Sequence, residues 1–146
     1  MPERDRGSQN QQVIAEFRAN GGVVGGYFAG IPLLLLTTTG AKSGRPHTTP
    51  LSYLADGGRC IVFAAAGGAP ASPDWYHNLI ASPSVTVEAG TEVFDATAAV
   101  TTGEERDALF ERYAAAQPQL VRYQSRTTRQ IPVVALSRRE DLTPAT

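Results

Sequence analysis

The chain has few of the residues that would build a disulfide framework, a metal cluster or a surface for a polyanion. Of its 146 residues one is a cysteine, Cys60, which excludes an intrachain disulfide and a cysteine-rich zinc or iron–sulfur site. Thirteen basic residues stand against fourteen acidic ones, so the net charge is −1, and like charges form no block. We therefore expect no nucleic-acid partner and a reducing compartment, the cytoplasm.

The sequence also lacks a segment suited to crossing a membrane. Its first ten residues, MPERDRGSQN, are polar and contain no signal-peptide core. The uncharged stretch 19–41 has the length of a span, but it is broken by Gly21, Gly22, Gly25, Gly26, Gly30 and Pro32. A membrane-spanning helix needs about 20 predominantly apolar residues without so many breakers. We expect no membrane span.

Self-contained catalytic motifs are missing as well. There is no G-x-S-x-G elbow, no H-E-x-x-H and no G-x-x-x-x-G-K-[ST] phosphate loop. No motif therefore supports a hydrolase or a kinase function. His47 and His77 have no third ligand nearby in the sequence, and no metal site is predicted. Cys60 lies in an apolar segment and is expected in the core rather than as a reactive thiol.

What is present is a succession of short apolar segments punctuated by turn residues. The pattern predicts six strands, at 31–39, 47–55, 59–66, 84–88, 93–100 and 131–136. Helices are expected at about 9–20 with Ser8 as the cap, at 74–80 after Ser72-Pro73, from the capping box at Thr102, and in a broken segment at 118–126.

These elements favour one fold class. Six strands joined largely in hairpins make an antiparallel sheet too apolar on one face to stand open, so closure into a small barrel with flanking helices is the simplest solution. The fold class is mainly β (α+β), and residues 1–146 are expected to form one domain. A doubly wound nucleotide-binding fold is excluded because strands and helices do not alternate.

The turn GAKSGRPHTTP, residues 40–50, concentrates polar groups between two predicted strands. It contains Lys42, the only lysine among the thirteen basic residues. Its two glycines allow backbone amides to converge, and Lys42, Ser43 and the threonine hydroxyls can bind an anion. The turn therefore predicts a phosphate or carboxylate site, although a surface turn is also where a solvated lysine is commonly found.

Two further segments are candidates for a pocket. The small residues of Ala65-Ala66-Gly67-Gly68 would let a flat ring approach the backbone, or would simply relieve crowding at a barrel corner. Trp75-Tyr76-His77-Asn78 would wall such a pocket, or Trp75 and Tyr76 would simply anchor the core.

Taken together, TTTG-x-KSG, TTPL, GGA and P-x-WYHNL resemble the deazaflavin-dependent nitroreductase and quinone reductase family, whose members use coenzyme F420. The resemblance runs from Ile31 to Asn78 and on to Gln130-Ile131-Pro132-Val133-Val134. It implies a flavin-reductase-like split β-barrel. It also implies that a reduced deazaflavin, 8-hydroxy-5-deazaflavin, passes a hydride to a quinone, an activated enone or a nitroaromatic.

The resemblance also implies which residues bind the cofactor. The phosphate and the acidic tail would meet Lys42, Ser43, Gly44, His47 and Thr48. The ring would meet Thr49, Pro50, Leu51 and Ser52 on one side, Phe63, Ala64, Ala65, Ala66 and Gly67 on another, and Trp75, Tyr76 and Asn78 at the closing helix. The chain departs from the family pattern at Ala41 and His47, where arginine is usual, and Arg45 is a local substitute.

Ser52 and Tyr123 are the side chains predicted to donate to a substrate oxygen. The nitro-reducing members carry a tyrosine at the position of Ser52 and several tyrosines in the segment that here, at 117–126, keeps only Tyr123. We therefore expect a small-molecule substrate, with quinones or enones preferred, and a homodimer. Two alternatives stay open: the same barrel binding FMN, and a non-catalytic carrier of the deazaflavin.

Overall fold

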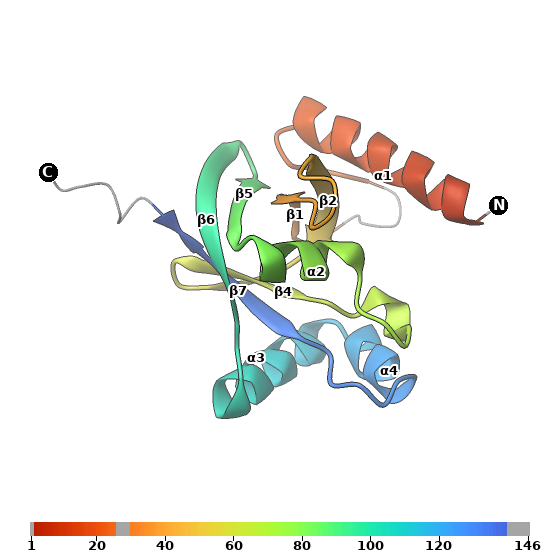
Figure 1. Ribbon diagram of the computed structural model, residues 1–146, viewed down its shortest axis with the longest axis vertical. Coiled ribbons are helices and arrows are strands. Elements are labelled where there is room, and N and C mark those ends of the chain that lie inside the picture. The colour runs from red at the N-terminus through yellow and green to blue at the C-terminus, as the bar shows by residue number, and fades with distance from the viewer. Residues whose placement is uncertain (1, 26–29, 140–146) are drawn as a thin grey trace, which may run out of the picture.

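The computed structural model describes residues 2–25 and 30–139 (Figure 1). Its elements in chain order are α1 (Pro2–Ala19), β1 (Leu33–Thr39), β2 (Pro46–Ser52), β3 (Leu54–Asp56), β4 (Arg59–Phe63), the 3₁₀ turn η2 (Ala66–Gly68), α2 (Asp74–Ala81), β5 (Ser84–Ala89), β6 (Glu92–Val100), α3 (Gly103–Ala116), α4 (Gln119–Ser125) and β7 (Val133–Arg138).

The seven strands form one antiparallel sheet in the order β2-β1-β5-β6-β7-β4-β3. The two strands at the ends of this order, β2 and β3, are consecutive in the chain and are separated only by Tyr53. The sheet must therefore curl until its edges approach each other, as Figure 1 shows. At the junction the Tyr53 N–H donates to Pro32 O at 3.3 Å. The predicted split barrel is confirmed.

Side-chain alternation along the strands separates an inner core from two outer ones. Leu34 and Leu36 of β1 point into the barrel, where they join Val62, Val87 and Leu136. The alternate residues of β1, Leu33 and Leu35, face outward and are covered by α1 through Ile14 and Phe17.

Helices close the other surfaces. The outer face of β4 and β7 is covered by α3 and α4, with Leu109 on Ile61 and Val133, and with Leu120 on Ile131. Trp75 and Leu79 of α2 complete the inner core. No helix in the described ranges is long and apolar enough to cross a membrane.

Two strand predictions need correction. The predicted strand 47–55 is two strands, because β2 pairs with β1 as far as Ser52 whereas β3 pairs with β4 from Leu54. The predicted strand 59–66 ends at Phe63. Beyond it Ala65 N–H turns back onto Phe63 O at 2.9 Å, and Ala66 takes a positive φ of 49°. The ladder stops where the chain must turn toward α2.

The expected helix caps are also corrected. α1 begins at Pro2, so Ser8 lies inside the helix rather than at its start. Pro73, and not Ser72, occupies the N-cap position of α2. Thr102 is the N-cap of α3 as predicted, but its side chain makes no capping hydrogen bond. These helices are held mainly by their buried apolar faces.

Candidate active site

A cleft of about 860 Å³ opens between the turn after β1, the start of β2 and helix α2. It gathers seven of the predicted site residues: Lys42, Ser43, His47, Thr48, Thr49, Trp75 and Asn78. Gly40, Ala41, Pro46, Asp74 and His77 complete the lining on these elements, and Gln11 reaches it from α1. Residues from three separate stretches of the sequence therefore meet in one concave site.

The turn that holds Lys42 is fixed by its own hydrogen bonds. Gly40 N–H donates to Arg45 O at 2.8 Å, Gly44 N–H donates to Gly40 O at 2.9 Å, and Arg45 N–H donates to Ser43 Oγ at 3.1 Å. A Cβ on Gly40 would lie 2.5 Å from Ser43 Oγ, and Gly44 has a φ of 71°. Both glycines are therefore needed for a closed turn that leaves Lys42 exposed.

Asn78 joins this turn to α2. The residue is 8% exposed, and its side-chain amide accepts a hydrogen bond from Ala41 N–H at 3.0 Å and donates one to Thr38 Oγ1 at 3.2 Å. Both contacts are with the protein, so Asn78 positions the turn as well as lining the cleft. These contacts join the TTTG and WYHN segments in space.

The charges in the cleft favour an anion. The cleft is lined by one ammonium, Lys42, by two imidazoles, His47 and His77, and by one carboxylate, Asp74, which belongs to the first turn of α2. Ser43 Oγ lies 3.4 Å from His47 Nε2, so this hydroxyl and imidazole converge over Gly40. Ammonium, imidazole and hydroxyl groups together suit phosphate or carboxylate oxygens.

A second group of predicted residues meets at the far end of β2. Ser52 Oγ accepts a hydrogen bond of 2.5 Å from the phenol of Tyr113 on α3. The Tyr113 ring stacks on Phe63 with centroids 4.5 Å apart, and Ala65 and Tyr123 belong to the same apolar cluster. Burial raises the pKa of Tyr113, and its hydrogen bond to Ser52 lowers it in part.

The side chain of Arg129 holds the loop that follows β4 through several hydrogen bonds. Its guanidinium donates to Ala65 O at 2.9 Å, Ala69 O at 3.0 Å, Ala64 O at 3.2 Å and Ser72 Oγ at 3.2 Å. The Arg129 carbonyl is itself held by Gln124 Nε2 at 2.7 Å. Sequence reasoning missed Arg129, and only the run of arginines before the last strand could have drawn attention to it.

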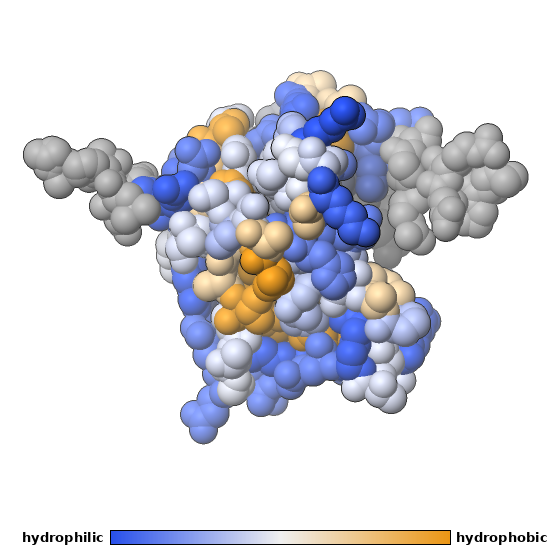
Figure 2. Space-filling model, viewed as in Figure 1, coloured by the Kyte–Doolittle hydropathy of each residue, from blue (hydrophilic) through white to orange (hydrophobic). Residues whose placement is uncertain are grey.

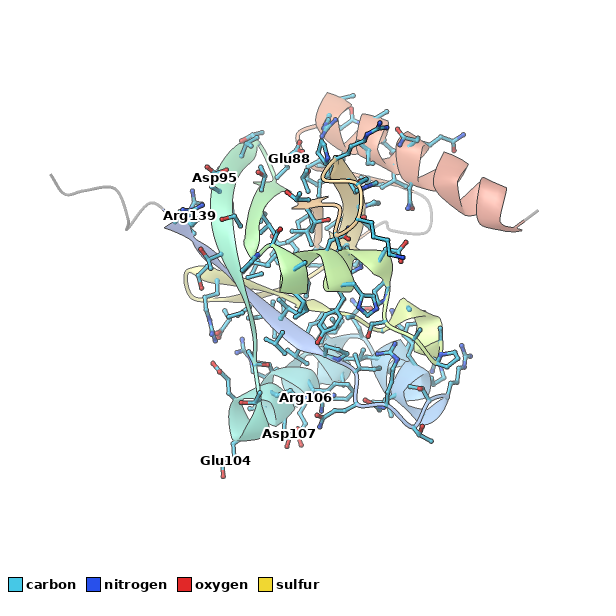
Figure 3. All side chains as sticks on the ribbon, viewed as in Figure 1. Glu88, Asp95, Glu104, Arg106, Asp107 and Arg139 are labelled. Carbon is cyan, nitrogen blue, oxygen red and sulfur yellow. The ribbon has the colours of Figure 1, made fainter. Side chains whose placement is uncertain are left out.

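A residue of α3 helps to hold the segment that carries Arg129, and with it the loop after β4. Arg106, labelled in Figure 3, is 8% exposed and donates to Ile131 O at 2.8 Å and to Gln124 Oε1 at 3.4 Å. Gly68 packs so closely on α4 that a Cβ there would lie 2.7 Å from Tyr123 O. At Gly68, then, the absence of a side chain relieves crowding between loop and helix.

The remaining predicted residues are placed between these two groups or behind them. Pro50 and Ala64 are buried, while Leu51 and Tyr76 pack partly buried on the inner core. Gly44 and Ala66 lie exposed in their turns, and Gly67 belongs to η2.

A smaller cavity of about 500 Å³ lies between α4 and the start of β1. It is lined by Ile31, Gln117, Gln119, Arg122, Tyr123 and Arg126, and its lining is therefore mostly polar. Tyr123, one of the two predicted donors, is the site residue found here. In the part of the chain that the structure describes, no group of three or more His, Cys, Asp or Glu side chains is placed to hold a metal ion.

The architecture defines a split-barrel protein with a cleft beside the barrel, lined by groups that suit an anion. Two solved structures with the same fold at 18% identity or less are a haem-storage protein, HutZ of Vibrio cholerae, with a TM-score of 0.56, and a pyridoxamine 5′-phosphate oxidase-like protein of Listeria innocua, with a TM-score of 0.52. At this identity they show the fold alone.

Residues 9–138 match the family model of the F420H(2)-dependent quinone reductases, and the chain belongs to that family. It is 42% identical over 132 residues to F420H(2)-dependent quinone reductase Rv1261c of Mycobacterium tuberculosis, covering 86% of this chain and 87% of the relative. The resemblance to the deazaflavin-dependent reductase family, suggested by the sequence motifs, is confirmed.

Solved structures of similar proteins agree with this family assignment. An F420-H2 dependent reductase, FDR-A, is 40% identical with a TM-score of 0.68, covering 73% of this chain and 94% of that one. A structure described as a domain-swapped dimer is 34% identical with a TM-score of 0.70, covering 94% of this chain and all of that one.

The residues present fit the cofactor of this family. Coenzyme F420 is a deazaflavin ring joined through a ribityl phosphate to an acidic tail, so it needs an anion site some way from a ring site. The cleft supplies Lys42 and His47 at one end of β2, and Ser52 lies at the other end. His47 and Ser52 are five positions apart along β2, roughly 17 Å at about 3.3 Å per residue.

Proposed function

We propose that this protein reduces quinones with hydride from F420H2, binding the phosphate and acidic tail of the cofactor at the Lys42 turn and the ring near the Ser52 end of β2. The observation that carries the assignment is the placement of an anion-binding cleft and a hydroxyl-bearing cluster at the two ends of one strand. When bound, the reduced deazaflavin supplies the hydride from its C5.

The residues of the chain then divide the remaining tasks. Lys42, Ser43, Gly44, His47 and Thr48 hold the anionic part, and Asn78 keeps their turn in place. Thr49, Pro50, Leu51 and Ser52 back the ring, the backbone of Phe63, Ala64, Ala65, Ala66 and Gly67 faces it, and Trp75 and Tyr76 close the site. Ser52 and Tyr123 donate to the substrate oxygen.

A cofactor titration tests this assignment. The protein is titrated with F420 and, separately, with FMN, and binding is followed by absorbance. We expect saturable binding of F420 and much weaker binding of FMN. FMN lacks the acidic tail that the cationic and hydroxyl groups of the cleft would bind. Equal or tighter binding of FMN would favour an FMN-dependent reductase. Tight binding of F420 without quinone turnover would favour a carrier.

We further propose that the protein acts as a homodimer. The relative of 34% identity is described as a domain-swapped dimer. Figure 2 shows apolar surface gathered around the C-terminal end of α2, where Ile80 is 53% exposed. A contiguous exposed apolar surface favours association. Light scattering should give twice the mass of the 15.5 kDa chain, and a monomer at working concentration would contradict the proposal.

The cytoplasm remains our proposed location. Cys60 is half-buried, and burial raises the pKa of its thiol, so it stays protonated and of low reactivity. A single half-buried thiol suits a compartment in which disulfides do not form.

A further inference from the structure

The contact between Tyr113 and Ser52 links a buried acid to the proposed site. Tyr113 is 7% exposed, and its phenol oxygen lies 2.5 Å from Ser52 Oγ. Its surroundings are apolar: Ala65, Leu120 and Ile131 form one cluster with it, and Phe63 stacks on its ring. A buried phenol needs a hydrogen-bond partner, and Ser52 provides it.

The direction of this hydrogen bond determines what Ser52 can do. Tyr113 has one proton and donates it toward Ser52 Oγ. A serine hydroxyl carries one proton of its own besides its two acceptor lone pairs. Since Oγ is the acceptor here, the Ser52 proton is directed elsewhere. Among the described residues, Tyr113 is the hydrogen-bond partner recorded for this hydroxyl.

The neighbours of both residues line the polar cavity described above. Ser52 pairs with Leu33 across the β1–β2 ladder, and Ile31 of the same segment lines the cavity. Gln117, the C-cap residue of α3, lines the cavity too, and its N–H donates to Tyr113 O at 2.8 Å. The cavity also contains Tyr123, so the second predicted donor lies on the same side of the molecule.

We infer that Tyr113 and Ser52 form a relay that moves two protons together toward the oxygen of the reduced quinone. The inference rests on the proposed function and goes beyond it by naming the source of the proton. Hydride addition delivers two electrons and one hydrogen to the quinone and leaves an anionic oxygen. The Ser52 O–H bond breaks as its proton bonds to that oxygen, and the Tyr113 proton moves to Ser52 Oγ. Tyr113 regains a proton from water, so quinone, hydride and one solvent proton give the hydroquinone.

The environment of Tyr113 suits a proton donor. Burial raises the pKa of its phenol, so Tyr113 is protonated in neutral solution, and the hydrogen bond to Ser52 counteracts part of that effect. Tyr113 touches neither cofactor nor substrate in this scheme. It acts through Ser52 and is a positioning and relay residue, whereas Ser52 is the catalytic residue.

A proton inventory tests the relay. The single-turnover rate of quinone reduction by F420H2 is measured in mixtures of light and heavy water for the parent, for Tyr113→Phe and for Tyr53→Phe. Tyr53 is the matched control, because it is the residue after Ser52 and its phenol also has a pKa raised by burial, but it packs on the inner core. We expect the plot of rate against the deuterium fraction of the solvent to be curved for the parent and for Tyr53→Phe, since two protons move together. For Tyr113→Phe we expect a straight line.

The rate should also fall about ten- to a hundredfold in Tyr113→Phe, in the lower part of the range for general acid catalysis. A curved inventory and an unchanged rate in Tyr113→Phe, with an active parent, would overturn the relay. A parent that does not reduce quinones would instead overturn the proposed function.

A second measurement needs neither cofactor nor turnover. The phenolate absorbance of the cofactor-free protein is titrated for the parent, for Ser52→Ala and for Ser52→Thr. The Tyr113 transition should move to higher pH in Ser52→Ala, which cannot donate a hydrogen bond to the phenolate, and stay near the parent value in Ser52→Thr, which can. This titration does not require a Tyr113 variant to fold, so it still tests the relay if Tyr113→Phe is unstable. An unmoved Tyr113 transition in Ser52→Ala would contradict the coupling between Tyr113 and Ser52.

Discussion

Lys42 is the residue on which we expect the proposed anion site to depend most. It is the only lysine of the chain, it is exposed at the rim of the cleft, and its turn is held by backbone hydrogen bonds rather than by its side chain. Its removal should therefore affect binding without affecting folding. The Ser43 hydroxyl, by contrast, accepts a hydrogen bond from Arg45 N–H and shapes the turn.

Replacing Lys42 with alanine should weaken F420 binding about ten- to a hundredfold, since a charge-assisted contact contributes roughly 1.5–3 kcal/mol. The melting temperature should stay within about a degree of the parent, because an exposed lysine charge contributes little to stability. Isothermal titration measures the first quantity and calorimetry the second. Lys42→Arg keeps the charge and is the control. Parent-like affinity in Lys42→Ala would place the anion elsewhere.

At the scale of elements, the segment from β4 to α2 is organised by a side chain that lies about sixty positions away. The guanidinium of Arg129 binds three carbonyls of residues 64–69 and the hydroxyl of Ser72. The loop also includes Ala66 with its positive φ. The conformation of the proposed ring-facing backbone thus depends on Arg129.

Arg129→Gln should lower the free energy of unfolding by about 2–3 kcal/mol, because several buried carbonyls lose their charged donor. It should also weaken F420 binding about tenfold, since 1.4 kcal/mol of loop reorganisation corresponds to that factor. Urea unfolding and cofactor titration give the two numbers. Arg112→Gln, which removes an exposed arginine on α3 bonded to Asp56, should leave cofactor binding unchanged. An Arg129→Gln protein with full affinity would show that the loop does not contact the cofactor.

Asp56 ties the short strand β3 to its neighbours. Arg112 and Arg59 hold the pKa of its carboxyl below its usual range, through hydrogen bonds and charge. A carboxyl with a lowered pKa stabilises the fold above its unfolded pKa of about 3.9, and this contribution is lost as the pH falls through the folded value. Asp56→Asn should therefore destabilise the protein at pH 7 by at most about 1 kcal/mol, and the difference should shrink below about pH 4. A difference independent of pH would contradict the ion-pair origin.

The sequence predicted most elements of this fold because they carry local signals. The hairpin at Asp56-Gly57-Gly58 and helix 74–80 are examples, since turn residues and apolar spacing mark them. The break at Tyr53 carries no such signal: it exists because β2 and β3 pair with different partners. The contacts of Tyr113 and Arg129 with residues about sixty positions distant are likewise set by the closed sheet and are invisible to local patterns.

For the molecule as a whole, the site predicts which acceptors are reduced. The Ser52 position carries a small hydroxyl side chain, and the segment 117–126 provides one aromatic residue, Tyr123, beside polar side chains. Little stacking surface is available for flat nitroheterocycles. We expect a higher kcat/KM for a benzoquinone or naphthoquinone than for a bicyclic nitroimidazole, with F420H2 as donor. A clear preference for the nitroimidazole would show that other residues form the acceptor pocket.

The most direct test of the account is the quinone-dependent oxidation of F420H2 by the purified protein, followed by the return of the absorbance of oxidised F420. We predict turnover that saturates with both F420H2 and quinone, that is weakened at low F420H2 concentration in Lys42→Ala, and that reduced FMN does not support. Absence of turnover, or equal turnover with reduced FMN, would contradict the assignment of this split barrel as an F420H2-dependent quinone reductase.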